Sequence, residues 1–206
     1  MSRKAIIVGY SGHSYVVLDI LLSNNYEIKG YCDLTENQKN PYKLSYLGSE
    51  NHPDNLNILL QHDVFISIGA NEIRKKLFEK LLSKQISCPS VLHPNCSVSA
   101  SAEIMQGTIV MPGVIINACA KIGNAVICNS AAVIEHECII NDFVHIAPGA
   151  ILAGNVTVGK ESFIGANSVI KQGVKIGERV IIGAGSVILN DIADDTIVYG
   201  NPGRIK

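Results

Sequence analysis

Aliphatic residues, with one cysteine among them, recur at every sixth position through the C-terminal half of this chain. A helix repeats its buried positions every 3.6 residues and a half-buried strand every two, so neither produces a period of six. A period of six is typical of a parallel β-helix, in which short strands coil into a prism and one residue per face points inward. The predicted inward residues are Val98, Ile104, Val110, Ile116, Ile122, Cys128, Ile134, Ile140, Ile146, Leu152, Val158, Ile164, Ile170, Ile176, Ile182 and Ile188.

The neighbours of these positions predict how the coil turns. Directly after the aliphatic residue stand Gly123, Gly159, Gly165, Gly177 and Gly183, and Asn117, Asn129 and Asn141. Because glycine and asparagine tolerate left-handed backbone angles best, we expect each strand to bend into the next face there. Two positions before the aliphatic residue the side chain is small or β-branched, which suits a second inward site at a crowded corner. These residues are Ala102, Thr108, Ala120, Ala132, Ala150, Ser162, Ser168 and Ser186.

Residues 1–92 lack this period and alternate short apolar segments with helical patterns. Strands are expected over 4–9, 27–33, 63–69 and 86–92, and helices over 11–23 and 71–83. The buried helical residues would be Val16, Val17, Ile20 and Leu21 in the first helix, and Ile73, Leu77, Leu81 and Leu82 in the second. The polar stretch 34–53, with Pro41 and Pro53, reads as a loop with one short strand near 46–48.

This alternation predicts an α/β N-terminal domain of Rossmann type with a parallel sheet. We expect it to span residues 1–94, with the parallel β-helix domain over 95–206 and a hinge at His93-Pro94.

Composition narrows the function classes. A formal net charge of −1 argues against nucleic-acid or anionic-membrane partners, which usually require a basic surface. No apolar run approaches the roughly 18 residues of a membrane span, and the N-terminus lacks a signal-peptide pattern. The six cysteines are scattered without CxxC spacing, which predicts reduced thiols in a cytoplasmic protein.

The first strand–helix junction is a candidate phosphate site. Gly9 and Gly12 would let the backbone approach a phosphate at the helix N-terminus, beside His13. The junction is not GxGxxG, so a dinucleotide site is not indicated. Asp33 ends the second strand, where Rossmann-like folds place a carboxylate for a ribose or base. From spacing alone, a tight strand–helix turn and a strand-end cap explain these residues equally well.

Several motifs follow one another in order: GYSGHS at 9–14, GYCD at 30–33, SIGANEIR at 67–74, LHP at 92–94, IEHE at 134–137 and GNPGR at 200–204. With the hexapeptides, they make the chain resemble the sialic-acid O-acetyltransferase and nucleotide-amino-sugar N-acetyltransferase family of left-handed β-helix acyltransferases. The resemblance implies a homotrimer whose α/β domain holds a nucleotide sugar and whose acetyl-CoA lies between solenoids. It implies N-acetylation of the 4-amino group of a UDP-4-amino-4,6-dideoxy type sugar in bacterial glycan biosynthesis.

The resemblance also implies roles for individual residues. His136 matches the general base and Glu137 its carboxylate partner, while Glu135 and Asn129 match positions lining the acceptor site. His145 matches a histidine near the thioester, and Gly154 the residue whose N–H points at the thioester oxygen. The nucleotide-sugar site would be formed by Gly9, Gly12, His13 and Asp33, with Gly69, Asn71 and Arg74 as weaker matches, and the CoA tail would lie near Gly200, Asn201 and Pro202. No metal is implied. Two departures are Leu34, where relatives often have a second acid, and Gly203, where alanine is usual.

The coil geometry supports this assignment independently. Three faces of six residues make an 18-residue coil, so Gly154 would stack directly on His136, above Ala118 and Ala100. His136 and His145 are half a coil apart and would lie on opposite sides of one prism. They can share a site only across subunits, which predicts an oligomer, most simply a trimer. An imidazole titrates near neutrality and suits the base, and direct attack by the amine requires no covalent acyl-enzyme.

Three alternatives remain open. An O-acetyltransferase of sialic acid would use the same residues. A metal enzyme of the carbonic-anhydrase type needs three histidines across a trimer interface, whereas the solenoid after His93 contains only His136 and His145. A non-catalytic nucleotide-sugar sensor or scaffold would keep the fold and lose the chemistry.

Overall fold

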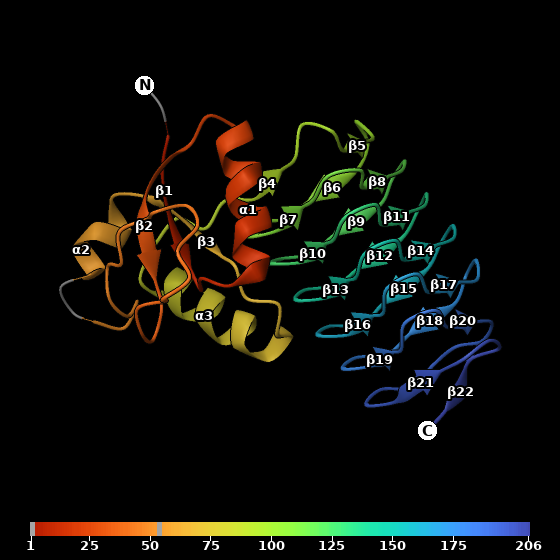
Figure 1. The fold of residues 1–206 in the computed structure, drawn as a ribbon. Helices are drawn as coiled ribbons and strands as arrows, with labels where there is room; N and C mark the ends of the chain where they lie inside the picture. The colour runs from red at the N-terminus through yellow and green to blue at the C-terminus, as the bar shows by residue number, and fades with distance from the viewer. Residues whose placement is uncertain (1–2, 53–54) are drawn as a thin grey trace.

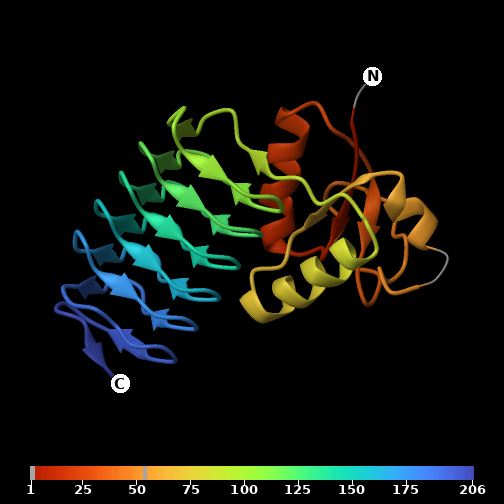
Figure 2. The same ribbon diagram turned by 180° about the vertical axis from the view of Figure 1, so that it is seen from behind.

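The computed structural model describes residues 3–52 and 55–206 as a small α/β unit followed by a solenoid of stacked coils (Figures 1 and 2). The α/β unit contains β1 (Lys4–Val8), α1 (Gly12–Ser23), β2 (Glu27–Cys32), α2 (Asn55–Leu60), β3 (Asp63–Ile66) and α3 (Asn71–Ser83). Its parallel sheet has the order β2-β1-β3. Helix α1 stands between this sheet and the first coils, and the C-terminus lies at the far end of the solenoid.

The N-terminal elements agree with the sequence prediction except for one additional helix and the segment 86–92. The short strand expected near 46–48 is present as a bridge between Tyr46 and Tyr31. Helix α2 was not predicted, because six residues are too few to display a helical period. Pro53 lies outside the described residues.

The strand expected over 86–92 is wrong as part of the α/β sheet. Only Val91–Leu92 (β4) is a strand, and it pairs with Ile109–Val110 (β7) of the solenoid. Ser87 still accepts a hydrogen bond from the Val64 amide at 2.8 Å. Pro89 has no amide hydrogen to continue such a ladder, so the segment leaves the sheet and starts the first coil.

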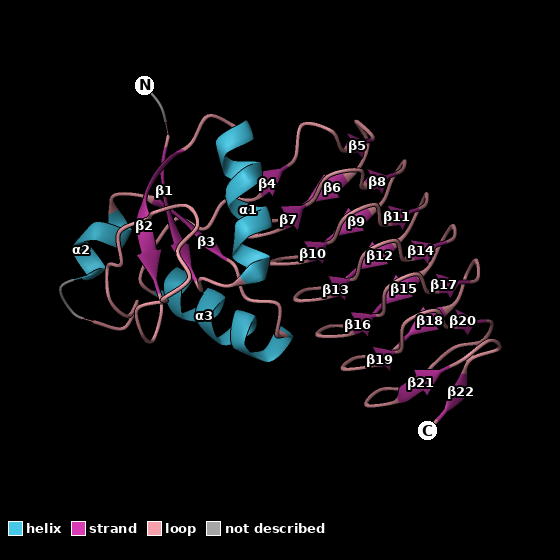
Figure 3. Cartoon of the chain, viewed as in Figure 1, coloured by secondary structure: helices cyan, strands magenta, loops and turns pink. Residues whose placement is uncertain are grey.

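The solenoid consists of short strands joined by turns, of two residues each except the three-residue β21, with no helix among its described residues (Figure 3). Its strands are β4, β5 (Ser97–Val98), β6 (Glu103–Ile104), β7, β8 (Ile115–Ile116), β9 (Lys121–Ile122), β10 (Ile127–Cys128), β11 (Val133–Ile134), β12 (Ile139–Ile140), β13 (His145–Ile146), β14 (Ile151–Leu152), β15 (Thr157–Val158), β16 (Phe163–Ile164), β17 (Val169–Ile170), β18 (Lys175–Ile176), β19 (Ile181–Ile182), β20 (Val187–Ile188), β21 (Ile197–Tyr199) and β22 (Arg204–Ile205).

Three sheets form the faces of the prism, and all their strand pairs are parallel except that of β21 with β22. The β13 face has the order β22-β21-β19-β16-β13-β10-β7-β4, the β14 face β20-β17-β14-β11-β8-β5, and the β15 face β18-β15-β12-β9-β6. Ile127 pairs with His145, so one coil takes 18 residues. The predicted fold class, an α/β domain joined to a β-helix of the left-handed hexapeptide type, is confirmed.

The six-residue period describes the interior correctly. From Val110 to Ile188 every predicted inward residue is buried, and only Val98 and Ile104 in the first coil are partly exposed. The small residues two positions earlier are also buried, apart from Ala102. The solenoid core is therefore a stack of aliphatic side chains that continues into the core around α1.

The predicted bend position is wrong. Left-handed backbone angles occur three residues after the inward residues from Ile104 to Ile182, not directly after them, and they recur without a break from Gly107 to Gly185. Alanine, glutamate and arginine occupy some of these corners, as at Ala125, Glu137 and Arg179. The glycines directly after the inward residues serve close stacking: a Cβ on Gly123 would stand 2.7 Å from the Asp142 backbone nitrogen one coil further on. Proximity between coils, not backbone conformation, requires glycine there.

Helix α3 buries Leu81 as expected, and Leu77 and Leu82 are half-buried against the core. The prediction for Ile73 is wrong, because this residue is 51% exposed, whereas Arg74 and Phe78 are buried. These two residues are buried because the helix also lies against the solenoid corners. In α1, Val17, Ile20 and Leu21 are buried as expected, and Val16 is half-buried.

No helix within residues 3–52 and 55–206 is long and apolar enough to cross a lipid bilayer.

Candidate active site

Two histidines meet where the α/β unit contacts the β13 face. His13 lies in the first turn of α1, His145 begins β13, and their ring centroids are 6.4 Å apart. His145 is only 9% exposed, and its ring packs edge-on against Phe163 at 5.0 Å. Its Nδ1 lies 3.4 Å from the Gly69 carbonyl oxygen and its Nε2 lies 3.2 Å from Asn129 Nδ2. The structure thus brings together His13, Gly69, Asn129 and His145.

Both imidazoles are held in the neutral form. Burial, assisted by the positive charge of Arg74, lowers the pKa of His13 to about 4. The same two causes lower the pKa of His145 to about 4, against a small opposing effect of its hydrogen bond to Gly69. His13 Nε2 is buried and has no partner among the described residues. A buried nitrogen left in this state is well suited to a ligand that supplies the missing hydrogen bond.

The turn between β1 and α1 is shaped by contacts across the sheet. Gly9 has φ +87°, and a Cβ there would stand 2.6 Å from Ile68 Cγ1, so no other residue fits. Gly12 faces open space, with nothing within 4 Å of an added Cβ. The Tyr10 amide donates to Asp33 Oδ2 at 2.9 Å, which ties the turn to the end of β2.

Asp33 is held at the mouth of this turn. Its second oxygen, Oδ1, accepts from the Leu34 amide at 2.7 Å. Each carboxylate oxygen has a further lone pair, so the bonds to Tyr10 and Leu34 orient the group without using all of its acceptor capacity. A cavity of about 510 Å³ opens beside it, lined by Asp33, Thr35, Glu36, Asn37, Gln38 and Lys39.

His136 lies elsewhere on the solenoid, in the turn between β11 and β12. It is exposed, and its Nδ1 lies 3.1 Å from Glu137 Oε2. Glu137 occupies a left-handed corner with φ 60°. The neighbouring Glu135 accepts a hydrogen bond from Asn117 Nδ2, one coil earlier, at 2.8 Å. His136 and His145 therefore lie on different parts of the prism, as the nine-residue separation predicts.

Gly154 stacks on His136 as the 18-residue coil predicts. A Cβ on Gly154 would stand 2.5 Å from His136 Nε2, far inside van der Waals contact. Only glycine leaves space beside this nitrogen, which is the atom not held by Glu137.

The predicted CoA-tail residues form the end of the solenoid. Gly200 has φ +101°, and its amide donates to Ser186 Oγ at 3.1 Å. Asn201 and Pro202 lie in the turn between β21 and the antiparallel β22. A Cβ on Gly203 would approach Ile188 Cδ1 to 2.6 Å, so this chain packs that turn more closely than an alanine would allow.

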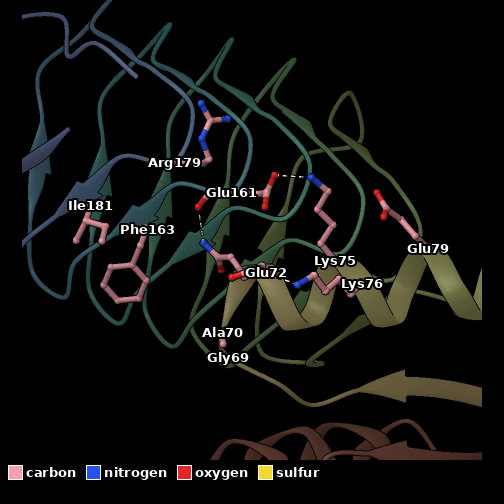
Figure 4. A pocket seen from close by; sticks show the side chains of 11 residues that line it. Gly69, Ala70, Glu72, Lys75, Lys76, Glu79, Glu161, Phe163, Arg179 and Ile181 are labelled. Carbon is pink, nitrogen blue, oxygen red and sulfur yellow. Dashed lines mark hydrogen bonds and ion pairs between the residues drawn. The ribbon is translucent and has the colours of Figure 1, made fainter. Parts of the chain in front are cut away.

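Beside His145, a cavity of about 910 Å³ separates α3 from β16 and β19 (Figure 4). Phe163 and Ile181 form its apolar wall, opposite the start of α3. Lys75 and Glu161 form an ion pair of 2.6 Å across it. The remaining lining residues are Gly69, Ala70, Asn71, Glu72, Lys76, Glu79 and Arg179.

Sequence reasoning missed the main side chain that connects the two units. Arg74 was a weak candidate for the nucleotide-sugar site, but its guanidinium is buried among backbone carbonyls. A signal was present: Arg74 and Phe78 are four residues apart, so an arginine stands on the same helical stripe as a large apolar residue. Within the described ranges, no three His, Cys, Asp or Glu side chains lie together as a metal site requires.

Comparison with known proteins agrees with this architecture. A model of the PglD N-terminal domain matches residues 4–81, and one of the bacterial transferase hexapeptide (six repeats) matches residues 155–190. The acetyltransferase domain of PglB from Neisseria gonorrhoeae is 34% identical, with all of both chains covered and a TM-score of 0.92. The chain belongs to the PglD-type family of hexapeptide-repeat acetyltransferases.

Two further solved structures are similar to this chain over nearly its full length. PerB from Caulobacter crescentus, solved with CoA and GDP-perosamine, is 32% identical over 98% of this chain and 97% of its own, with a TM-score of 0.90. WeeI from Acinetobacter baumannii is 24% identical over the full length of both chains, with a TM-score of 0.88, and shares the fold. The sequence-based recognition of the family is confirmed.

Proposed function

We propose that this acetyltransferase moves the acetyl group of acetyl-CoA to the amino group of a nucleotide-linked amino sugar. The observation that carries the proposal is the full-length similarity to PerB, which is solved with CoA and GDP-perosamine. The PglB domain is likewise solved with acetyl coenzyme A. The family resemblance implies a UDP-4-amino-4,6-dideoxy sugar, and the GDP-linked sugar of PerB is the competing acceptor class.

His136 is the proposed general base. Its Nδ1–H donates to Glu137 Oε2, so the lone pair on Nε2 is free to accept a proton beside Gly154. The neutral amine attacks the thioester carbon, an N–C bond forms, and the amine proton passes to Nε2. Collapse of the tetrahedral intermediate breaks the C–S bond, and CoA leaves as a thiolate that the imidazolium protonates. A base positioned in this way contributes roughly 10²–10⁴ to the rate.

The remaining site residues are proposed to bind the two substrates. The Gly154 amide stabilises the developing oxyanion. The turn at Gly9 and Gly12 holds the diphosphate at the start of α1, and Asp33 contacts the nucleoside. His13, Asn129 and Glu135 face the sugar, and His145 lies beside the thioester. Gly200, Asn201 and Pro202 contact the CoA tail.

The active enzyme is proposed to be a homotrimer, because His136 and the His13–His145 pair lie on different parts of one prism. The β14 face offers a suitable contact surface. Its outward residues form an aliphatic stripe: Ile115, Val133, Ile151, Val169 and Val187. The β15 face is more polar, with Glu103, Lys121 and Lys175 pointing outward. A continuous apolar stripe on a solvent-exposed surface is typical of a subunit interface.

A cytoplasmic location is also proposed. All six cysteines are free, and four of them, Cys32, Cys88, Cys128 and Cys138, are buried. Unpaired buried thiols are typical of a reducing compartment.

The test is CoA release from acetyl-CoA with a panel of acceptors, using the wild-type enzyme and His136→Ala. The panel contains a UDP-4-amino-4,6-dideoxy sugar, GDP-perosamine and free or CMP-linked sialic acid. Turnover of one amino sugar, reduced about 10²-fold or more in the variant, is the expected result. Turnover of sialic acid alone would move the activity to O-acetylation. Tight nucleotide-sugar binding without any CoA release would favour a non-catalytic sensor.

A further inference from the structure

Arg74 is a buried cation, and its hydrogen-bond acceptors among the described residues are all neutral. It is 1% exposed, and burial lowers its pKa to about 9, so it stays charged at neutral pH. Its guanidinium donates to the carbonyl oxygens of Ile68 (3.1 Å), Gly69 (2.9 Å), Ala125 (2.8 Å) and Phe143 (2.7 Å), and to Asn71 Oδ1 (2.8 Å). Burying a charge without a counter-ion is costly, and these hydrogen bonds only partly offset the cost. Such a group calls for an explanation beyond packing.

The helix that carries Arg74 lies along one column of solenoid corners. These left-handed corners, 18 residues apart, are Gly107, Ala125, Phe143 and Glu161. The Phe78 ring occupies the space beside Gly107, where a Cβ would collide with it. Arg74 bonds the second and third corners, and Asn71 Nδ2 donates to the Glu161 carbonyl at 2.8 Å. One face of α3 therefore fixes the α/β unit against four successive coils.

The guanidinium also fixes both sides of His145. Arg74 Nη1 and His145 Nδ1 share the Gly69 carbonyl as acceptor, at 2.9 and 3.4 Å. Arg74 Nη2 donates to the carbonyls of Phe143 and Val144, the two residues directly before His145. The same side chain thus sets the acceptor for the imidazole and the backbone from which the imidazole projects.

This network defines the tautomer of His145. A carbonyl oxygen only accepts, so Nδ1 carries the hydrogen. Asn129 Oδ1 accepts from the Ser130 amide at 2.9 Å, which directs its NH₂ group toward His145 Nε2. Nε2 is then an acceptor with a lone pair. Only a neutral imidazole satisfies both contacts.

We propose that Arg74 is a positioning residue of the active site, which orients His145 through Gly69 and keeps the His13–His145 pair neutral. A second positive charge near a buried guanidinium is unfavourable, so the pair is held as hydrogen-bond and proton acceptors. The groups around His145 are His13 from α1, Arg74 from α3, Asn129 after β10 and Phe163 from β16. None of them supplies a compensating negative charge. The catalytic consequence of this arrangement rests on the proposed function.

The test is ¹⁵N NMR of the imidazole nitrogens across a pH titration, with His13 and His145 assigned from single His→Asn variants. In the wild-type protein, His145 is expected to remain neutral with the hydrogen on Nδ1 down to about pH 5, consistent with its pKa of about 4. In Arg74→Gln, we expect the pKa of both histidines to rise, while the remaining effect of burial keeps it below the ordinary value of 6.5. Arg74→Lys keeps the charge but not the planar fork, so the pKa values stay low while Nδ1 loses its fixed partner.

Lys75→Gln is the matched control. Lys75 follows Arg74 in the same helix and also contacts a solenoid corner, through a half-buried ion pair with Glu161, so its charge has a counter-ion. It should leave both histidine titrations unchanged.

Unchanged pKa values of His13 and His145 in folded Arg74→Gln would overturn the proposal. Should that variant fail to fold, the wild-type spectrum decides: a cationic His145 at pH 6, or one protonated only at Nε2, contradicts the network. The spectra need no substrate turnover. A shifted pKa pair without acetylation of any amino sugar would therefore support this inference and reject the proposed function.

Discussion

Gly154 lies directly over the imidazole of His136, one coil further along the solenoid, and a Cβ at this position would stand 2.5 Å from Nε2. The nitrogen that must accept the substrate proton is therefore the one that the missing side chain leaves accessible. Glu137 holds the opposite nitrogen at 3.1 Å. The geometry of the proposed base thus depends on a residue with no side chain.

Gly154→Ala should displace the imidazole and lower kcat by roughly 10- to 100-fold, as partial loss of a positioned base predicts. Its backbone is not left-handed, so alanine should cost little stability. Gly185→Ala is the control for activity: an added Cβ there meets nothing within 4 Å, and its φ of +68° should lower stability without affecting the site. Steady-state kinetics with thermal unfolding separates the two effects, and full activity of Gly154→Ala would refute the stacking account.

The buried histidines should make stability depend on pH. Their pKa of about 4 in the folded state lies below the ordinary value of 6.5, so the unfolded chain binds more protons between these limits. The free energy of unfolding should consequently fall as the pH is lowered from about 6.5 toward 4. Urea denaturation at several pH values measures the slope. His145→Asn should flatten it, whereas His136→Asn, at an exposed position, should not.

The aliphatic stripe on the β14 face should hold the trimer together. Ile151 lies in the middle of this stripe and is 41% exposed in the single chain. Ile151→Glu would bury a charge in the interface, so light scattering after gel filtration should show dissociation to monomers, with loss of activity. Thr157→Glu on the β15 face is the matched control and should leave the oligomer intact. A wild-type protein that is monomeric at assay concentration would contradict the interface.

A site shared between subunits should allow complementation. His136→Ala and His13→Asn should each be inactive as homotrimers, because each removes one half of every site. Mixed trimers formed by co-expression should recover about a quarter of wild-type activity, since random assembly pairs two intact halves in that fraction of sites. No recovery in mixed trimers would show that both histidines act within one chain.

The periodic parts of the fold could be predicted from the sequence because one residue in six must point inward. This rule places Ile134, Leu152 and Ile170 correctly in the core, and it also predicts that Gly154 stacks on His136. The position of the left-handed corners could not be found in this way. Glu137, Phe143 and Arg179 adopt positive φ although their side chains do not favour it, because closure of the coil demands it.

Contacts between the two units could not be predicted from either pattern alone. Arg74 is buried because it donates to the carbonyls of Ala125 and Phe143. These acceptors belong to the solenoid repeat, far from helix α3 in the sequence, so the helical pattern alone does not reveal them. Ile73 is predicted to be buried from the apolar pattern of its helix, but contact with the solenoid turns the Arg74 side of the helix inward and leaves Ile73 51% exposed. The roles assigned to His136, His145 and Asp33 rest on resemblance and geometry together, and they remain predictions.

The most direct test of the account is the identity of the acetylated product. Purified enzyme, ¹³C-acetyl-CoA and a UDP- or GDP-linked 4-amino sugar should yield a product that carries the label on nitrogen, as an amide resistant to hydroxylamine. Mass spectrometry and ¹H–¹³C correlation NMR identify the labelled position. A hydroxylamine-labile ester, or unmodified nucleotide sugar recovered from a stable enzyme complex, would contradict the account.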